Sequence, residues 1–393
     1  MVRVEINGTC DDRFAKVKEV FAKHFETGED VGASFAVYKD GKSMVDIWAG
    51  HADAARTRPW DKDTLVCVFS STKVMAALCV HVLADRGLID YDAPVAKYWP
   101  EFAQAGKENV LVRHVLSHTS GVATYPEQVT REDFVDWTKM TRLLEHMTPL
   151  WQPGTKLGYH MTSFGFLTGE IVRRVTEKSI ATFFHDEIAK PLGADFYIGL
   201  PVQHHGRLAD LIPPKGPGVF DLVNSDFAFK LLGKPVGLAI ARNPKIPIAN
   251  INEMNHMKEW LAAEVPSSNG TGNARSMAKV GAMVACGGEL DGVRLLSPAI
   301  IKKIATPQFT GKGYLLAKTC MGLGLGINIK KMANGKVPLA IGWSGLGGSY
   351  CVMDLDNRMS YAYAMNKMNL AIVGDPRRGR FEKALYESLQ AFH

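Results

Sequence analysis

A serine and a lysine three residues apart raise the first question about chemistry. Ser70 and Lys73 lie in the stretch VCVFSSTKVMAA, residues 66–77, at the start of an apolar run with helical character. A serine hydroxyl is a weak nucleophile at neutral pH and needs a base within hydrogen-bond reach. Residues three apart on a helix share one face, so this spacing pairs Ser70 with Lys73 and directs Ser71 elsewhere.

The start of a buried helix suits this chemistry. Burial disfavours the charged ammonium, so Lys73 loses its proton more easily and can act as a base. The backbone N–H of Ser70 has no partner inside the helix, and such a group can hold a developing oxyanion. The alternative is a serine that caps the helix beside a solvated lysine. Because S-x-x-K recurs at Ser276–Lys279, the pattern alone does not choose between these interpretations.

Two further motifs distinguish the S-x-x-K copy at Ser70 from the copy at Ser276. GYHMTSFG places Tyr159 just after the turn Pro153-Gly154, and IGWSGLGGSY is a glycine-rich piece that enters a strand pair. The order of S-x-x-K, a tyrosine-led motif about ninety residues later and an x-x-Gly strand resembles the serine β-lactamase and penicillin-binding-protein superfamily. The chain more closely resembles the family VIII carboxylesterases, which are esterases with a class C β-lactamase fold.

The resemblance extends over most of the chain. Three segments look like connecting segments of that family: residues 83–102, 113–122 and 274–298. The last contains Ser276–Lys279, where the family has an ordinary structural helix. The resemblance therefore assigns the chemistry to Ser70.

The resemblance implies roles for three residues. Ser70 matches the acylated serine, and Lys73 matches the lysine that assists its deprotonation. Tyr159 matches the tyrosine that, as a phenolate or within a Lys–Tyr relay, takes the serine proton, returns it to the leaving alcohol and later activates water. A phenolate needs a lowered pKa, which Lys73 and a second nearby cation would provide. The alternative for Tyr159 is a buried tyrosine with a hydrogen-bonded hydroxyl.

The third motif is Trp343-Ser344-Gly345, which matches Lys-Thr-Gly of β-lactamases and Trp-x-Gly of family VIII esterases. Gly345 would let substrate lie against the strand, and the N–H of Leu346 would join that of Ser70 as an oxyanion donor. The alternative is a plain glycine-rich turn before a strand.

Two departures from the β-lactamase pattern bear on the substrate. Met161 replaces an asparagine that holds the drug's amide side chain, and Trp343 replaces the lysine that attracts its carboxylate. Both make the site less polar and favour a small neutral ester, with slow β-lactam turnover as a side activity. We count Met161 and His160 among the substrate-binding residues, although His160 could equally be structural.

Other patterns suggest no metal or cofactor. We expect His118 to pack and hydrogen-bond rather than act as a base. His204-His205 lack a third ligand at metal-binding spacing. GLGLG at 322–326 lacks the strand–turn–helix context of a dinucleotide site, so we expect a strand there. No G-x-S-x-G elbow is present, which argues against an α/β-hydrolase.

The elements that must position these residues indicate an α/β, β-lactamase/transpeptidase-like fold. Helical spacing or apolar runs predict helices at residues 11–27, 70–86, 113–122, 132–147, 163–178, 274–286 and near the C-terminus. Turn signals predict hairpins at Asp40-Gly41, at Asp356-Asn357 and within 287–296. We expect an antiparallel sheet built from both chain ends (1–90 and 260–393), a mainly helical domain (91–259), and the active site in the cleft between them.

Composition limits the partners. The 393 residues carry a net charge of +6 without a Lys/Arg block. We interpret Arg377, Arg378 and Arg380 as a solvated face and expect no nucleic-acid partner. Six scattered cysteines form no CxxC pair, no eighteen-residue apolar run is present and the N-terminus lacks a signal-like apolar stretch. These features predict a cytoplasmic protein without a membrane partner, whereas the oligomeric state stays open.

The sequence thus predicts a serine carboxylesterase that cleaves short-chain esters, its small-molecule partners, through an acyl-serine and without a cofactor. Three rivals remain. An acyltransferase on the same scaffold would use an alcohol or amine in place of water. A D-amino or peptide amidohydrolase is opposed by the missing Lys-Thr-Gly. A non-catalytic penicillin-binding homologue is opposed by the intact set of Ser70, Lys73 and Tyr159.

Overall fold

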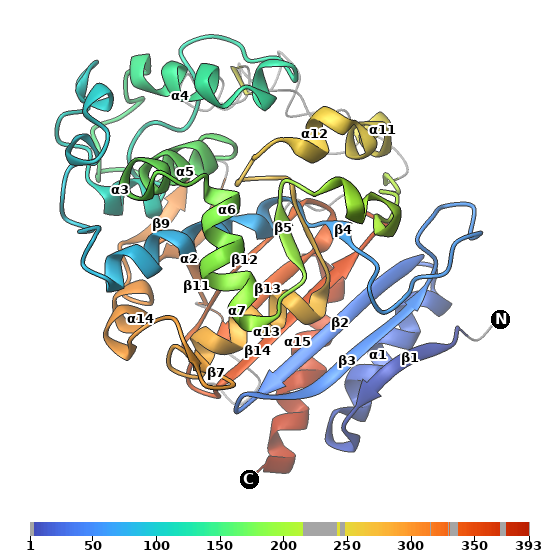
Figure 1. Ribbon diagram of the computed structural model, residues 1–393. Helices are drawn as coiled ribbons and strands as arrows, with labels where there is room; N and C mark the ends of the chain where they lie inside the picture. Colours follow the sequence, from blue (N-terminus) through green and yellow to red (C-terminus); the bar gives the residue numbers. More distant parts are fainter. Residues whose placement is uncertain are drawn as a thin grey trace.

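A computed structural model gives the architecture of the chain (Figure 1). The structure describes residues 4–214, 242–243, 248–314, 316–328, 330, 337–369 and 375–392. Most of the region around 200–250, where the sequence suggests long loops bordering a cleft, lies outside the described residues.

A nine-stranded sheet runs through the molecule in the order β1-β3-β2-β14-β13-β12-β11-β10-β9, and every neighbouring pair is antiparallel. Its strands are β1 (Ile6–Cys10), β2 (Gly32–Lys39), β3 (Lys42–Gly50), β9 (Phe309–Gly313), β10 (Leu316–Met321), β11 (Gly326–Ile327), β12 (Ala340–Ser344), β13 (Tyr350–Asp354) and β14 (Met359–Met365). The N-terminal β2 pairs with the C-terminal β14, with Ala36 opposite Ala362. The predicted sheet built from both chain ends is confirmed (Figure 1).

The turn chemistry explains the hairpins. Asp40 and Gly41 join β2 to β3 with φ values of 51° and 77°, and Asp-Gly is favoured where both turn residues need positive φ. The predicted turn at Asp356-Asn357 joins β13 to β14, and the hairpin within 287–296 consists of β7 (Glu289–Leu290) and β8 (Val293–Arg294).

The predicted strand over GLGLG is largely wrong. Residues 322–325 form a turn in which Gly324 has a φ of 76°, and only Gly326 and Ile327 are in a strand. The neighbouring strands β9 and β10 were not predicted. Their sequence, with glycines at 311 and 313 and lysines at 312 and 318, lacks a continuous apolar alternation.

Helices cover both faces of the sheet. On one face, α1 (Ala15–Glu26) and α15 (Pro376–Ser388) enclose an aromatic core in which the rings of Phe35 and Phe381 stack at 4.1 Å. On the other face, α13 (Ala274–Ala285) approaches β14 so closely that a Cβ at Gly281 would lie 2.2 Å from Ser360 Oγ. These helices confirm the predictions for residues 11–27, 274–286 and the C-terminus.

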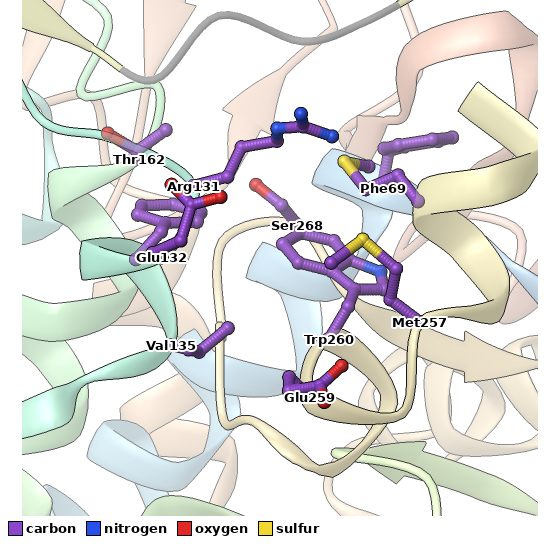
Figure 2. A pocket seen from close by; sticks show the side chains of 11 residues that line it. Phe69, Arg131, Glu132, Val135, Thr162, Met257, Glu259, Trp260 and Ser268 are labelled. Atoms are coloured by element: carbon purple, nitrogen blue, oxygen red, sulfur yellow. The ribbon is translucent and has the colours of Figure 1, made fainter. Parts of the chain in front are cut away.

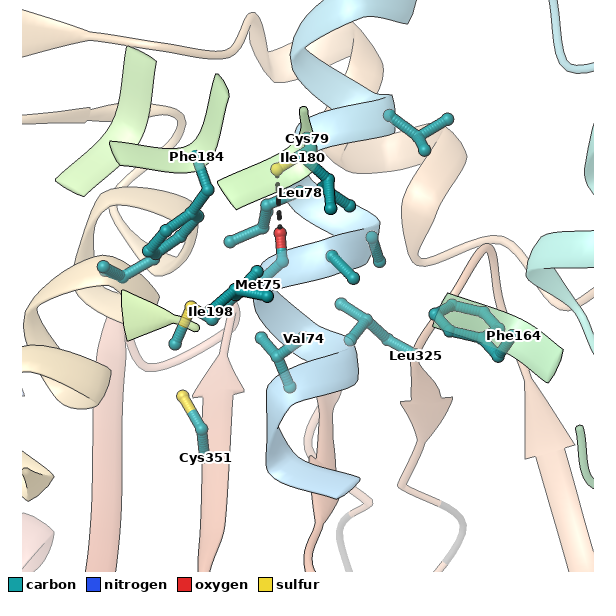
Figure 3. Packing of buried hydrophobic residues seen from close by; sticks show 14 of the residues in the cluster. Val74, Met75, Leu78, Cys79, Phe164, Ile180, Phe184, Ile198, Leu325 and Cys351 are labelled. Carbon is teal, nitrogen blue, oxygen red and sulfur yellow. Dashed lines mark hydrogen bonds between the residues drawn. The ribbon is translucent and has the colours of Figure 1, made fainter. Parts of the chain in front are cut away.

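Helix α2 (Thr72–Asp85) lies inside the molecule rather than on its surface (Figure 1). Every residue from Thr72 to Leu83 is buried, which is the expected fate of a helix that is apolar on all sides. Figure 3 shows Val74, Met75 and Leu78 of this helix among side chains from surrounding elements, Phe164 and Phe184 included. The core therefore fixes the helix that carries Lys73 and directly follows the turn with Ser70.

The remaining helices of the described residues lie mostly between the two sheet-forming parts of the chain. They are α3 (Val112–Leu116), α4 (Trp137–His146), α5 (Ser163–Thr176), α6 (Ile180–Phe184), α7 (Lys190–Leu192), α11 (Ile251–His256), α12 (Lys258–Ala262) and α14 (Pro298–Ile304). A small antiparallel sheet orders β4 (Val66–Cys67), β6 (Gly270–Gly272) and β5 (Phe196–Ile198). Within the described residues, no helix has the length and apolar character needed to cross a membrane.

Candidate active site

Ser70 sits in a short 3-10 turn, Phe69–Ser71, that leads into α2. Phe69, directly before it, has a φ of 44°, and a bulky residue in this left-handed region is a conformational outlier that the surrounding packing must hold. The turn leaves Ser70 half-buried. Ser71 is directed elsewhere, as predicted, because its Oγ lies 3.2 Å from Ser349 Oγ.

Lys73 is fully buried, and its Nζ lies 3.3 Å from Ser70 Oγ. Nζ also donates to the carbonyl oxygens of Met161 (2.8 Å) and Ser267 (3.0 Å). Burial lowers the pKa of Lys73 well below its ordinary value, as the sequence predicted. A neutral amine has two N–H groups and one lone pair. In the neutral form of Lys73, with both N–H groups donated to these two carbonyls, the lone pair would be left to accept from the Ser70 hydroxyl.

Tyr159 reaches the same oxygen. Its hydroxyl donates to Ser70 Oγ at 2.8 Å and accepts from the indole Nε1 of Trp343 at 3.3 Å. Burial raises the pKa of Tyr159, and the hydrogen bonds with Ser70 and Trp343 only partly oppose this shift. The predicted lowering of its pKa is therefore wrong: a neutral indole, not a second cation, contacts the phenol oxygen. The phenol form is favoured over the phenolate.

The third motif lies against the turn that carries Ser70. Gly345 follows β12, and a Cβ on it would lie 2.0 Å from the carbonyl oxygen of Val68 and 2.4 Å from Ser349 Oγ. Only glycine permits this approach. Ser349 Oγ donates to the same Val68 oxygen at 2.8 Å. Residues 68–70 therefore pack against residues 343–349, and this close contact leaves no room for a side chain at position 345.

Two arginines from the start of α15 donate hydrogen bonds to this segment. Arg377 Nη2 donates to the carbonyl oxygen of Gly347 at 2.6 Å, and Arg378 Nη1 donates to Ser344 Oγ at 3.1 Å. Arg377 is 1% exposed and pairs with Asp30 at 2.9 Å and Asp375 at 2.7 Å. The interpretation of the arginines as a solvated face is therefore wrong for Arg377. The sequence holds no signal for this contact, because its partners are far apart along the chain.

His160 does not face the reacting serine. Its ring is fully buried, with Nε2 2.6 Å from Ser120 Oγ and Nδ1 2.6 Å from the carbonyl oxygen of Gly158. Burial lowers its pKa to about 4. Because both ring nitrogens have partners within the protein, the structure favours the structural alternative for His160. His118 packs as predicted, with its ring 5.2 Å from that of Tyr159.

Met161 and Ser267 contribute through their backbones. The carbonyl oxygens of both residues accept hydrogen bonds from Lys73. The Met161 side chain, two residues after Tyr159, is half-buried. Ser267 was not predicted. Its Oγ accepts from Gly165 N and donates to Thr162 O, which ties the two carbonyl-bearing segments together.

The second S-x-x-K copy has an ordinary environment. Ser276 Oγ accepts from the backbone N–H of Asp195 at 2.8 Å, and Lys279 faces Asp291 at 3.8 Å. The tandem histidines also have protein partners, since His204 Nε2 lies 2.9 Å from the hydroxyl of Tyr197.

Comparisons with known proteins agree with this architecture. The model of the Beta-lactamase family matches residues 18–383. The esterase/beta-lactamase LipL of Mycobacterium tuberculosis (strain ATCC 25618 / H37Rv) is 34% identical over 371 residues, which are 92% of this chain and 83% of the relative.

Two solved structures are also similar. A family VIII carboxylesterase is 40% identical, with a TM-score of 0.89 over 98% of this chain and 100% of the other. A penicillin-binding protein homolog from Caulobacter crescentus is 37% identical, with a TM-score of 0.87 over the same shares. A family match over nearly the whole length, relatives above 30% identity and a shared fold lead to one conclusion: the chain belongs to the beta-lactamase family.

Proposed function

We propose that this protein is a serine carboxylesterase that hydrolyses short-chain carboxylic esters through an acyl-serine. The observation that carries the proposal is the environment of Ser70 Oγ, which lies 3.3 Å from a buried lysine amine and 2.8 Å from a tyrosine hydroxyl. Relatives named as esterase and carboxylesterase share most of the chain.

In the acylation step, the Ser70 hydroxyl transfers its proton to the lone pair of Lys73 as Oγ bonds to the ester carbonyl carbon. The N–H groups of Ser70 and Leu346 bind the resulting oxyanion, and losing one such donor typically costs about 3–4 kcal/mol in the transition state. The carbon–oxygen bond to the alcohol then breaks. The alcohol leaves with a proton from Tyr159, which Lys73 restores.

In the deacylation step, a water molecule takes the place of the alcohol. Lys73 accepts a proton from the water as the water oxygen attacks the acyl carbon. Tyr159 returns a proton to Ser70 Oγ as the bond between Oγ and the acyl carbon breaks and the acid leaves, and Lys73 restores the proton of Tyr159. Trp343, Ser344 and Gly345 line the strand along which substrate lies. The indole N–H of Trp343 keeps the phenol of Tyr159 directed toward Ser70.

The substrate preference follows from the groups beside this set. Met161 and Trp343 supply no charge to attract an anionic lactam, so we propose neutral esters as substrates and only weak β-lactam hydrolysis. The site would lie in a cleft between the sheet-bearing part (1–90 and 260–393) and the helical part (91–259). All six cysteines are free thiols, which fits the reducing cytoplasm.

The test is hydrolysis of p-nitrophenyl acetate, butyrate and decanoate by the wild type and by Ser70→Ala. Ser276→Ala is the matched control, because it alters the other S-x-x-K copy. We expect activity in the wild type and in Ser276→Ala, and none in Ser70→Ala. Mass spectrometry of the quenched reaction should show one acyl group on Ser70. Full activity in Ser70→Ala, or an inactive wild type, would overturn the proposal.

A further inference from the structure

An apolar cavity of about 350 Å³ is lined in part by Phe69, Thr162 and Ser268 (Figure 2). It has the size of a small-molecule pocket. Five large apolar side chains form most of its wall: Phe69, Phe134, Met254, Met257 and Trp260. The proposed mechanism gives this cavity no role.

Segments of the candidate site supply part of the cavity wall. Three of its lining residues are chain neighbours of residues in the site: Phe69 precedes Ser70, Thr162 follows Met161, and Ser268 follows Ser267. Met161 and Ser267 are the two residues whose carbonyls hold Lys73. These neighbours place the cavity next to the segments whose carbonyls hold Lys73.

The leaving alcohol belongs on the other side. It must lie where Tyr159 can protonate it, and Tyr159 is bonded to Trp343. Among the described residues, the cavity lining includes neither Tyr159 nor Trp343. The two substituents of a bound ester carbonyl point in opposite directions, so the group that enters the cavity is the acyl group.

The wall suits an uncharged hydrocarbon. The rings of Phe134 and Trp260 are nearly parallel, with centroids 6.2 Å apart, and methionines adapt their shape to a ligand. The charged lining residues Arg131, Glu132 and Glu259 are exposed, which places them at the opening. Figure 2 shows Arg131 and Glu132 beside each other, so the opening carries both signs of charge and does not select an ionic group.

We infer that this cavity is the acyl-binding pocket, and that it takes an apolar acyl group, chain or aryl-alkyl, of about six to eight carbons. The inference deepens the proposed function and rests on it. An apolar cavity of about 150 Å³ holds one benzene molecule, so the larger cavity here has room for a six- to eight-carbon group and leaves an acetyl group surrounded by empty space. The best acyl chains then lie at the upper end of the short-chain range.

The first experiment measures kcat/KM for p-nitrophenyl esters from acetate to dodecanoate. We expect kcat/KM to rise by up to about fourfold per added methylene, to peak at six to eight carbons and to fall for dodecanoate. Val135, which lines the cavity, is replaced in Val135→Phe to fill it. This variant should lose about tenfold or more in kcat/KM for octanoate and less than twofold for acetate.

Val202→Phe is the matched control, since Val202 is 78% exposed and does not line the cavity. It should keep the wild-type profile. A wild-type optimum at acetate, or an unchanged octanoate-to-acetate ratio in Val135→Phe, overturns the pocket assignment while leaving the esterase proposal intact.

A binding measurement separates the two proposals. Methyl octanoate titrated into Ser70→Ala should quench tryptophan fluorescence, because Trp260 lies in the wall. Ser70→Ala/Val135→Phe should bind it at least tenfold more weakly. If no ester is hydrolysed by the wild type, the proposed function fails, and this titration still decides the pocket. Equal binding by both variants overturns the pocket.

Discussion

At the residue scale, the proposed mechanism makes the reactivity of Ser70 depend on the charge state of Lys73. Two carbonyl oxygens would stabilise an ammonium, yet complete burial dominates and lowers the pKa of Lys73. Burial acts in the opposite sense on Tyr159 and raises its pKa. Burial therefore favours the neutral form of both groups, and the proposed mechanism uses Lys73 as the proton acceptor and Tyr159 as the proton donor.

The first prediction concerns the pH dependence of ester hydrolysis. Because protonated Lys73 cannot accept the serine proton, kcat/KM should fall as pH drops through the lowered pKa of Lys73 and should be flat above it. Lys73→Met and Lys73→Arg should both lose about 10²–10⁴-fold in kcat/KM, since arginine keeps the charge but does not deprotonate. Lys279→Met, in the other S-x-x-K copy, should retain the wild-type profile. Substantial activity in Lys73→Arg would contradict the assignment.

At the scale of elements, the turn after β12 depends on two distant segments. Arg377, at the start of α15, donates to the carbonyl oxygen of Gly347 and pairs with buried Asp30 from the loop after α1. Asp30 also accepts from the hydroxyl of Tyr363 on β14. Despite the burial of its carboxylate, the pKa of Asp30 is lowered by His24, whose Nδ1 lies 3.4 Å from Oδ2, and by Arg377 and Tyr363. The turn is therefore positioned by both helices on that face of the sheet.

The second prediction is that Arg377→Met destabilises the protein by about 3–5 kcal/mol, because it leaves the buried Asp30 carboxylate without its cation. Arg377→Met/Asp30→Asn should recover part of this loss. Arg380→Met is the control: its pair with Glu29 is partly exposed, so it should cost about 1 kcal/mol or less. Urea unfolding measures all three. A loss in Arg377→Met no larger than in Arg380→Met would contradict the role of this pair.

In folded Arg377→Met, kcat should also fall more than KM rises. The Gly347 carbonyl loses its donor, so the nearby N–H of Leu346 is held less firmly at the position where the proposed mechanism places the oxyanion. A variant that is only destabilised would keep the wild-type kcat per folded molecule.

At the scale of the whole molecule, packing in the core determines how accessible each cysteine thiol is. Cys67, Cys79, Cys320 and Cys351 are buried, and Cys10 and Cys286 are partly buried. Burial raises the pKa of Cys67 and of Cys351 to about 12. A thiol is reactive only as the thiolate and only where a reagent reaches it. These thiols pack as small apolar groups.

The third prediction follows for thiol labelling at pH 8. In the folded protein, Cys10 and Cys286 should react with a thiol reagent well before the four buried cysteines. In urea all six should react at similar rates. Peptide mass spectrometry after partial labelling identifies the sites. Early labelling of Cys67 in the folded protein would contradict the packing around the start of α2.

Local chemistry made much of this protein predictable. Helical spacing placed Ser70 and Lys73 on one face, and the structure confirms their contact. The dipeptide Asp40-Gly41 is also a local signal, and it predicted the hairpin of β2 and β3. Apolar periodicity likewise predicted α1 and α15, the helices near the two chain ends.

Tertiary structure decided what depends on contacts between distant residues. The carbonyl of Ser267 accepts from Lys73, and Arg377 contacts both Gly347 and Asp30. No sequence spacing predicts these contacts. The rise in the pKa of Tyr159 and the burial of His160 also depend on what surrounds each group. Spacing determines which side chains share a face of one element. Burial and desolvation depend on all the elements packed around a group, and those exist only in the folded chain.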